Sequence, residues 1–358
     1  MSDALRLTID GIAVDAVAGE TVLDAAKRAG VHVPTFCHDD RLDPTGACRM
    51  CLVEIEGQRK LQPSCLYKAA DGMAVTTASE KIEKHRAVLL SMYLADTATP
   101  DEGLPPERAA GVGNKLRDYA SERSDLIALP EVGSPREGRP QVNPYIGFDP
   151  DSCILCARCT RYCDEIEGVS AIQLTDRGGK TTIGTVGMVD LLETSCELCG
   201  GCVAVCPTGA LYEKKAPQDS AEDEQLVRTT CNFCGVGCQF DLRVRDDKVV
   251  AVEAPPPGTT LNDGNLCVKG RFAYDFIGHP DRLTVPLVRD AAGRLVEATW
   301  EEAMSRAAAG LAKIRDRDGG DALGFVSSSR CTGEENYLMQ KLSRAAFGTN
   351  NCHQCAAT

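Results

Sequence analysis

The chain has 358 residues, 43% of them hydrophobic, and a formal net charge of −13. That length and apolar content suit two or more domains, and the acidic balance argues against nucleic acid or an anionic membrane surface as a partner, because both select basic patches. The first residues show no secretion signal, and apolar runs such as AVLLSMYLA are too short to cross a bilayer. We therefore expect a soluble cytoplasmic protein whose 19 cysteines stay reduced and bind metal before they form disulfides.

The first 79 residues have the pattern of a small sheet with one helix. LRLTIDGIAVDAVAG alternates like two strands broken at Gly11, and ETVLDAAKRAG is a short amphipathic helix between a Thr21 cap and Gly30. CLVEIEG and MAVTTAS supply two more strands. Strand, turn, strand and helix in this order predict a β-grasp domain over residues 1–79.

Four cysteines of this domain form the first candidate metal site. Their spacing is C-x10-C-x2-C-x13-C: Cys37, Cys48, Cys51 and Cys65. Thiolates two residues apart can chelate one centre, and a [2Fe–2S] cluster takes four thiolates. Structural zinc also accepts four cysteines, but the β-grasp pattern and the segments downstream favour iron. His38 either tunes this cluster by hydrogen bonding or is a solvated loop residue.

Residues 80–144 have the pattern of a helical connection. EKIEKHRAVLLSMYLADT predicts a helix, a loop rich in proline and glycine follows, and NKLRDYASERSDLIAL predicts a second helix. Residues 130–144, PEVGSPREGRPQVNP, have the composition of a linker. The stretch AAGVGNK lacks the strand-to-helix setting of a nucleotide-binding fingerprint and predicts a turn.

Residues 145–215 carry C-x2-C-x2-C-x3-C twice, as CILCARCTRYC and CELCGGCVAVC, the second followed by Pro207. This is the bacterial ferredoxin run, in which the fourth cysteine binds the other cluster. The pattern predicts two [4Fe–4S] clusters with exchanged ligands: Cys153, Cys156 and Cys159 with Cys206, and Cys196, Cys199 and Cys202 with Cys163. Zinc has no need of this duplication.

An acidic joint at 216–226 precedes a third kind of site, expected in a small domain over 227–285. The motif CNFCGVGC and a distant cysteine give C-x2-C-x3-C-x28-C: Cys231, Cys234, Cys238 and Cys267. Alone this spacing suits zinc or [4Fe–4S], and its position after two ferredoxin-type motifs favours iron. Three isolated cysteines remain and are expected to be buried small side chains: Cys331, Cys352 and Cys355.

Residues 286–358 have α/β texture. TWEEAMSRAAAGLAKIRD predicts a helix, ALGFVSSS a strand of the buried type, and TGEENYLMQKLSRAAFG a helix that ends at Gly348.

This order of sites resembles the large (alpha) subunit of cytoplasmic NAD-dependent, molybdenum- or tungsten-containing formate dehydrogenases. It is also similar to the related G-type large subunit of respiratory NADH:quinone oxidoreductase. The resemblance covers essentially the whole chain and is carried by GACRMCLVEIEG, CILCARCTRYC, CVAVCPTGAL, LCVKGRF, HPDRLTVPL and ENYLMQKLSRAAFGTNN. The last three favour formate dehydrogenase.

The resemblance implies an α+β multidomain protein in which residues 286–358 begin an α/β molybdopterin oxidoreductase domain. Formate would be oxidised at a bis-pterin molybdenum or tungsten centre. Electrons would pass through three [4Fe–4S] clusters and one [2Fe–2S] cluster to diaphorase-type partner subunits that bind flavin and NAD. Lys269 would lie between the last [4Fe–4S] cluster and a pterin and help relay electrons; otherwise it is a solvated surface lysine. The alternatives are a freestanding iron–sulfur electron carrier and a fragment of the G-type large subunit.

Two departures from the family pattern matter. Many relatives hold an extra [4Fe–4S] cluster with one histidine and three cysteines after the β-grasp domain; here Thr97 stands near the histidine position and no cysteine follows before Cys153, so that cluster is expected to be absent. In relatives, GTNN introduces a cysteine or selenocysteine that ligates the metal. By alignment from Cys355, that ligand is expected just after Thr358, encoded by a UGA codon; a frameshift or a deliberately short chain is the alternative.

Overall fold

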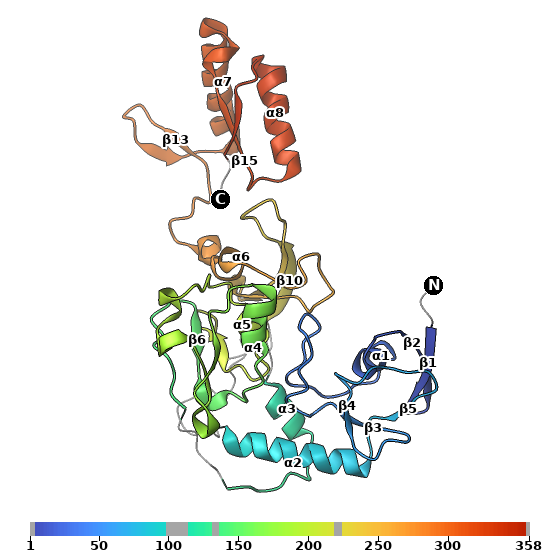
Figure 1. Cartoon of the computed structure of the whole chain (residues 1–358). Coiled ribbons are helices and arrows are strands. Elements are labelled where there is room, and N and C mark those ends of the chain that lie inside the picture. Colours follow the sequence, from blue (N-terminus) through green and yellow to red (C-terminus); the bar gives the residue numbers. More distant parts are fainter. Residues whose placement is uncertain (1–3, 98–113, 131–135, 218–223, 356–358) are drawn as a thin grey trace.

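The computed structural model describes residues 4–97, 114–130, 136–217 and 224–355, with side chains up to His353. The regions follow one another in chain order, from a sheet at the N-terminus through a cysteine-rich centre to two long helices at the opposite end (Figure 1). No helix among the described residues is long and apolar enough to span a membrane.

The N-terminal region is a five-stranded mixed sheet with one helix packed on it. Helix α1 (Val22–Arg28) begins at a capping box, in which the Thr21 hydroxyl accepts from the Asp24 N–H and the Asp24 carboxylate accepts from the Thr21 N–H. The helix ends before Gly30, whose φ of +73° favours glycine. The strand order is β2-β1-β5-β3-β4, with β1 and β5 parallel. The strands are β1 (Ala4–Ile9), β2 (Ile12–Val17), β3 (Leu52–Ile55), β4 (Gln62–Pro63) and β5 (Ala74–Thr76).

Two helices connect this sheet to the centre. The first predicted helix is confirmed as α2 (Glu80–Asp96), but the second, expected over 114–129, is shorter: α3 covers Lys115–Ser121. Beyond α3 the chain runs back along α2, because the Ile127 N–H donates to the Ser91 hydroxyl over 2.8 Å. A tertiary hydrogen bond therefore replaces the helical one that the sequence pattern favours.

The described residues of the predicted linker over 130–144 form no helix or strand, but the segment is anchored to the protein and is not fully solvated. Arg139 and Asn143 are buried against the cysteine-rich centre. The Asp190 carboxylate holds this segment by accepting from the backbone and side-chain N–H groups of Asn143 and from the N–H before it. Proline, glycine and charge look like a solvated loop in sequence, yet here they form a structural part of the centre.

The cysteine-rich centre, 145–215, is built from short elements around a shared core. An antiparallel pair, β6 with β9, closes it, and a π-type turn over Tyr162–Ile166 carries Cys163. Its elements are β6 (Ile146–Phe148), α4 (Arg158–Arg161), β7 (Gln173–Thr175), β8 (Thr182–Gly184), α5 (Gly201–Ala204) and β9 (Leu211–Glu213). So little regular structure means that side-chain packing and cysteine loops define the region.

The next region is an antiparallel meander followed by a short helix. Its elements are β10 (Gln225–Thr230), β11 (Gln239–Arg245), β12 (Lys248–Glu253) and α6 (Val268–Phe272). Phe272 inserts into the core of the cysteine-rich centre and stacks on Tyr145 with ring centroids 4.8 Å apart. The two regions therefore share one hydrophobic core.

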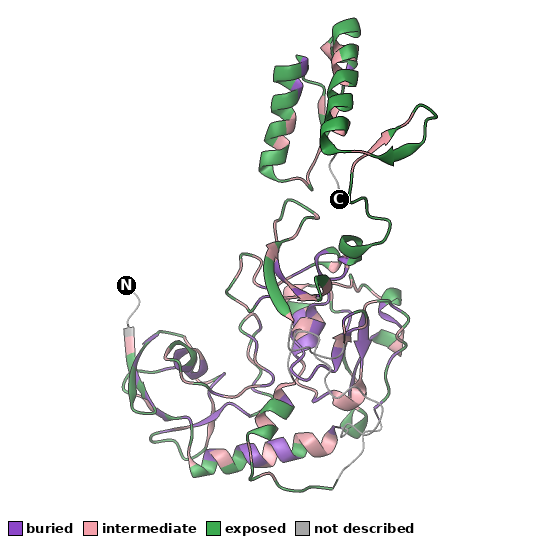
Figure 2. Ribbon diagram, turned by 180° about the vertical axis from the view of Figure 1, so that it is seen from behind, coloured by how far each residue is buried: buried purple, intermediate pink, exposed green. Residues whose placement is uncertain are grey.

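The last region, 286–358, contains a hairpin, two helices and a parallel strand pair. Its elements are β13 (Leu287–Arg289), β14 (Leu295–Glu297), α7 (Trp300–Asp318), β15 (Phe325–Ser328), α8 (Gly333–Phe347) and β16 (Cys352–Cys355). The predicted helices are confirmed, and α8 ends at Gly348 with φ +66°. The expected burial of the strand is wrong: Val326 is 68% exposed, and α7 has no buried residue (Figure 2).

Candidate metal centres

The first cysteine group lies in the loops of the N-terminal region, and all four side chains are buried. Backbone N–H groups of Phe36 and Cys37 donate to the Cys48 sulfur over 3.4 and 3.5 Å, and the Cys48 N–H donates to the Cys37 sulfur over 3.4 Å. The sulfurs of Cys51 and Cys65 lie 3.4 Å apart. The structure thus turns the four predicted thiols into one buried donor set.

These thiols are also electrostatically coupled in pairs. Hydrogen bonding with Cys48 lowers the pKa of Cys37 to about 5, and hydrogen bonding with Cys65 lowers the pKa of Cys51 to about 6. In each pair the partner's pKa is raised, first because its thiol forms the hydrogen bond to the neighbouring sulfur, then because it is buried and because the neighbouring thiolate disfavours a second negative charge. Two thiolates are therefore available near neutral pH, and a cation is needed to hold all four.

The double motif of the centre has the same backbone twice. Leu155 and Leu198, each two residues after the first cysteine of its motif, have φ of +53° and +54°, and their N–H groups donate to the sulfurs of Cys153 and Cys196 over 3.4 Å. Leucine in the left-handed region is strained, and such strain concentrates at functional sites. Here the strained residue turns its N–H toward the preceding sulfur.

The electrostatic interactions between sulfurs of the two motifs agree with the exchanged sets that the sequence predicts. Burial, then the charges of Cys206 and Cys156, raise the pKa of Cys153 to about 12. Burial and the charge of Cys163 likewise raise the pKa of Cys196. The charge of Cys206 acts on all three of the first cysteines of the other motif, and the charge of Cys163 acts on Cys196 and Cys202.

The third group is more open. The Cys231 N–H donates to the Cys238 carbonyl over 2.7 Å, closing the loop of CNFCGVGC, and Cys267 stands at the start of α6. Burial, then the charges of Cys267 and Cys234, raise the pKa of Cys231. Cys234 and Cys267 are exposed, as is Lys269 on α6. The four predicted residues face one another near the surface.

The four cysteine groups lie in a continuous series. Cys37 and Cys156 belong to one hydrophobic cluster, and the charge of Cys37 acts on Cys156. The charge of Cys202 acts on Cys159, which joins the two sets of the centre. At the far side, Cys199 and Cys267 line one pocket of about 320 Å³. Each group therefore adjoins the next.

A buried ionic cluster fixes this series, and sequence reasoning missed it. Asp39, 6% exposed, pairs with Arg41 over 2.9 Å and with Arg158, which lies inside the first centre motif. Asn265, next to the third group, accepts from the Arg41 guanidinium over 3.3 Å and from the Tyr162 hydroxyl over 2.7 Å. The guanidinium–carboxylate contacts lower the pKa of Asp39 well below its usual range, against the opposing effect of burial. The only feature of the sequence that points to this ionic cluster is the presence of charged residues next to cysteines.

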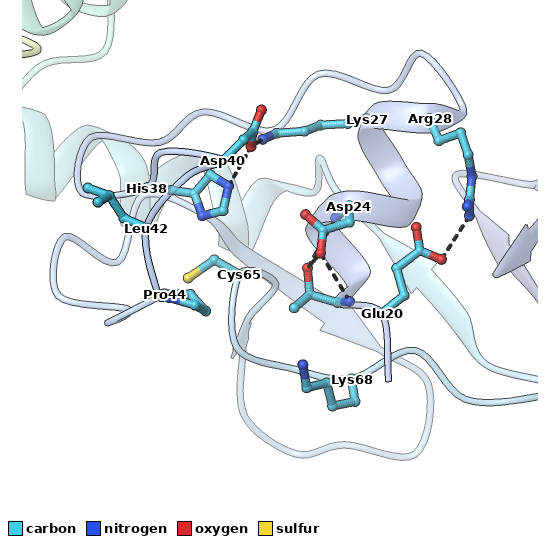
Figure 3. Close-up of a pocket in the computed structure, with 11 residues that line it drawn as sticks. Glu20, Asp24, Lys27, Arg28, His38, Asp40, Leu42, Pro44, Cys65 and Lys68 are labelled. Carbon is cyan, nitrogen blue, oxygen red and sulfur yellow. Dashed lines mark hydrogen bonds and ion pairs between the residues drawn. The ribbon is translucent and has the colours of Figure 1, made fainter. Parts of the chain in front are cut away.

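An open pocket of about 630 Å³ lies beside the first group (Figure 3). The side chain of His38 is 9% exposed and its Nε2 lies 2.9 Å from the Asp40 carboxylate, so the alternative of a solvated loop histidine is wrong. Lys27 pairs with the same carboxylate, and Cys65 also lines the pocket. The rest of the wall is mostly charged: Glu20, Asp24, Arg28 and Lys68. A partner of mixed charge can approach the first group here.

The predictions for the isolated cysteines and for the region after α2 can be compared with the structure only in part. Cys331 and Cys352 are half-buried, not buried, while the Cys355 side chain lies outside the described residues. Thr97 caps the end of α2. The stretch where a further cluster was expected to be absent lies mostly in 98–113, outside the described residues, as do 109–113 of the predicted turn.

The donor sets fit iron–sulfur clusters. Each group gathers four free thiols, and backbone N–H groups already point at sulfur in the first group and in both motifs of the centre. Burial raises the pKa of Cys159 and Cys202 well above 9.0, so these sulfurs carry charge only beside a cation. Iron–sulfur clusters take four thiolates each and supply that cation.

Models of known families match most of the chain in four separate parts, leaving 81–142 unmatched. They are the 2Fe-2S iron-sulfur cluster binding domain over 2–80, the ferredoxin-like domain of NADH-quinone oxidoreductase subunit 3 over 143–212, the molybdopterin oxidoreductase Fe4S4 domain over 224–279, and molybdopterin oxidoreductase over 282–358.

Curated proteins match over 97% or more of the chain. The alpha subunit of an NADPH-Fe(3+) oxidoreductase from Geobacter sulfurreducens is 37% identical over 350 residues, and a G-type subunit of NADH-quinone oxidoreductase from Rhizobium meliloti is 38% identical over 359 residues. A candidate formate dehydrogenase from Staphylococcus haemolyticus is 30% identical over 404 residues. The chain spans 39–40% of the length of these relatives.

Among solved structures, the chain is similar to one from the crystal structure of an NAD+-reducing [NiFe]-hydrogenase in the H2-reduced state. The TM-score is 0.54 at 28% identity, over 61% of this chain and 90% of that one. The chain thus matches 2Fe-2S, ferredoxin-like and Fe4S4 domain families followed by a molybdopterin oxidoreductase segment, and over 97% of its length it is similar to a G-type subunit of NADH-quinone oxidoreductase.

Proposed function

We propose that this chain is the iron–sulfur electron-transfer part of a formate dehydrogenase catalytic subunit. The observation that carries the proposal is the continuous series of four cysteine groups, in which Cys37 adjoins Cys156, Cys159 adjoins Cys202, and Cys199 adjoins Cys267. Electron transfer needs closely spaced centres, and this series supplies neighbouring groups that run from a fully buried first group to a third group near the surface.

Four sets of residues would hold the clusters, which supply one-electron carriers. Cys37, Cys48, Cys51 and Cys65 suit a [2Fe–2S] cluster. Three [4Fe–4S] clusters would be held by Cys153, Cys156, Cys159 and Cys206, by Cys163, Cys196, Cys199 and Cys202, and by Cys231, Cys234, Cys238 and Cys267. The protein would bury the first cluster, enclose the next two with buried and half-buried cysteines, donate backbone hydrogen bonds to their sulfurs, and hold them together through Asp39.

The two ends of the series suggest the partners. Lys269, exposed on α6 beside the third group, precedes the molybdopterin segment by 13 residues in the sequence (269 to 282) and is proposed as the relay toward a pterin centre. The pocket beside Cys65 offers a charged surface to a subunit that binds flavin and NAD. The names of two relatives include NADH or NADPH, which supports a nicotinamide-linked partner, and the name of a third supports formate.

A second function is favoured by one observation. Identity is higher to the G-type subunit of NADH-quinone oxidoreductase, 38%, than to the formate dehydrogenase candidate, 30%. In that case the same series of clusters would conduct electrons from a nicotinamide-linked partner, and no formate would be oxidised.

Metal analysis and electron paramagnetic resonance (EPR) test the shared part of both proposals. The anaerobically reconstituted chain is expected to bind iron and acid-labile sulfide for one [2Fe–2S] and three [4Fe–4S] clusters and to show their signals after dithionite reduction. Zinc in place of iron would overturn the proposal. Formate is tested separately, by adding formate or NADH to the complex isolated from its host cell: reduction of the clusters by NADH but never by formate would leave only the second function.

A further inference from the structure

Arg139 combines deep burial with unused hydrogen-bonding capacity. It is 2% exposed, and its Nε, Nη1 and Nη2 atoms are buried without a hydrogen-bond partner among the described residues. Its guanidinium lies over the Phe148 ring, 5.6 Å from the centroid. A guanidinium carries five N–H donors and stays charged, so burying it unpaired is among the least favourable arrangements in a protein interior.

The charges that face Arg139 are mostly cysteine sulfurs from both motifs of the centre. Its strongest attraction is to Cys202, followed by Asp190, Cys159 and Cys196. The Asp190 carboxylate is already occupied, since it accepts from the 142–143 backbone, the Asn143 side chain and the Leu192 N–H. Asp190 therefore does not take up the unused donors of Arg139, and the charges that act on its guanidinium include sulfurs from both motifs.

Two other buried arginines of the region show what a structural role looks like. Arg136 donates to the Cys153 carbonyl over 2.6 Å, and Arg271 donates to the Cys199 carbonyl over 2.9 Å. Both support a cysteine loop through its backbone. Arg139 makes no bond of that kind among the described residues, so backbone support does not explain its burial.

We propose that Arg139 is a positioning residue that sets the reduction potential of the paired [4Fe–4S] clusters, most strongly the one held by Cys163, Cys196, Cys199 and Cys202. An iron–sulfur cluster with four thiolates is an anion, and reduction adds one electron to it. A fixed cation whose N–H groups point toward the cluster sulfurs favours the reduced form and raises the potential. This inference rests on the proposed cluster assignment.

The test is an EPR-monitored redox titration of the reconstituted full chain and of Arg139→Met, with dithionite as reductant. Methionine keeps the length and apolar character but removes the charge, so the reduction equilibrium of the paired clusters is expected to become at least about tenfold less favourable, or about 59 mV lower for a one-electron couple. Arg139→Lys, which keeps the charge, is expected to recover most of the loss. Arg177→Met removes an exposed charge from the same region and is expected to leave the potentials unchanged.

The [2Fe–2S] cluster is an internal reference, because its cysteines are not among the main charges acting on Arg139. Its potential is expected to stay constant in Arg139→Met. Unchanged potentials of the paired clusters at full iron content would overturn the role of Arg139, and so would loss of iron from both the Met and the Lys variants. A wild-type chain that binds no iron would instead overturn the cluster assignment itself.

Discussion

The cysteine-rich centre and the C-terminal region both combine short strands with helices, but they are held together differently. The centre has little regular structure and a shared core that includes the fully buried Tyr162, Ile146 and Phe272. The C-terminal region has two long helices, yet its buried described residues are few: Leu323, Ser343, Phe347 and Thr349.

This difference shows which interactions determine each region. In 286–358, the helices begin at side-chain caps, Thr299 and Thr332, so local sequence suffices to form them. In the centre, strained left-handed leucines and buried charges persist only because distant residues hold them. Variants that remove one long-range group should therefore affect the centre far more than the C-terminal region.

Removal of a predicted ligand should have the largest effect. Cys206→Ser is expected to lose the iron of one [4Fe–4S] cluster and to destabilise the centre, because three buried thiols lose their fourth partner. Cys331→Ser, in the C-terminal region, is expected to keep full iron content. Iron and acid-labile sulfide per chain measure both variants, and equal iron in the two would contradict the predicted ligand set.

Loss of the buried Asp39 carboxylate should have the second-largest effect, a decrease in the stability of the fold. Asp39→Asn leaves the Arg41 and Arg158 guanidinium groups without their anion and is expected to reduce the free energy of unfolding by about 3–5 kcal/mol. Asp15→Asn breaks an exposed ion pair with Arg6 and is expected to change the free energy of unfolding by less than about 1 kcal/mol. Chemical denaturation measures both. Because the pKa of Asp39 is lowered on folding, its contribution should disappear as the pH falls below 3.8.

A smaller, pH-dependent effect is expected at Glu213 on β9. Burial raises the pKa of Glu213 from 4.5 to about 7, so the folded state binds more protons than the unfolded chain between these values. The free energy of unfolding should therefore fall, by roughly 2–3 kcal/mol, as the pH rises from about 4.5 to 7. Thermal melts across this range should lose that slope in Glu213→Gln and keep it in Glu297→Gln, an exposed control. An identical slope in both variants would show that another group titrates.

Substitutions on the exposed face of the C-terminal region are expected to change the free energy of unfolding least. Trp300, 70% exposed, is the only tryptophan of the chain, so its fluorescence reports on this face alone. Emission typical of solvated indole and full quenching by acrylamide are expected. Leu338→Gln should change the free energy of unfolding by less than about 0.5 kcal/mol, because this leucine is exposed. A protected Trp300, or a large loss in Leu338→Gln, would show that this face is covered in solution.

Local patterns predicted the long helices and four of the five strands of the first sheet. The capped helices and their glycine ends could be predicted because each depends on residues within a few positions, whereas β4 and the short elements between 146 and 297 were not predicted. The strand over 322–329 was predicted in type but not in burial, because exposure depends on what packs against it. The end of α3 was missed because Ser91 competes for the following backbone.

The cysteine groups could be predicted from the sequence because their short, regular spacing is typical of metal chelation. The residues that hold these groups in place could not be predicted. Asp39 meets Arg158 across 119 residues, and Asn143 meets Asp190 across 47. Nothing near Arg139 in the sequence indicates burial, since its neighbours are proline, glycine and polar residues. Charges become buried only through partners that sequence spacing does not reveal.

The proposed exchange of Cys163 and Cys206 between the two motifs has a consequence for how the chain can be divided. With clusters bound, the halves before and after the β7–β8 hairpin are cross-linked by metal, so a protease cut in that hairpin should yield two peptides that separate only after chelation. The hairpin can also vary in length without parting the motifs. Deleting, duplicating or transplanting one motif alone would leave both clusters without a complete ligand set, so the two motifs have to stay together in one protein.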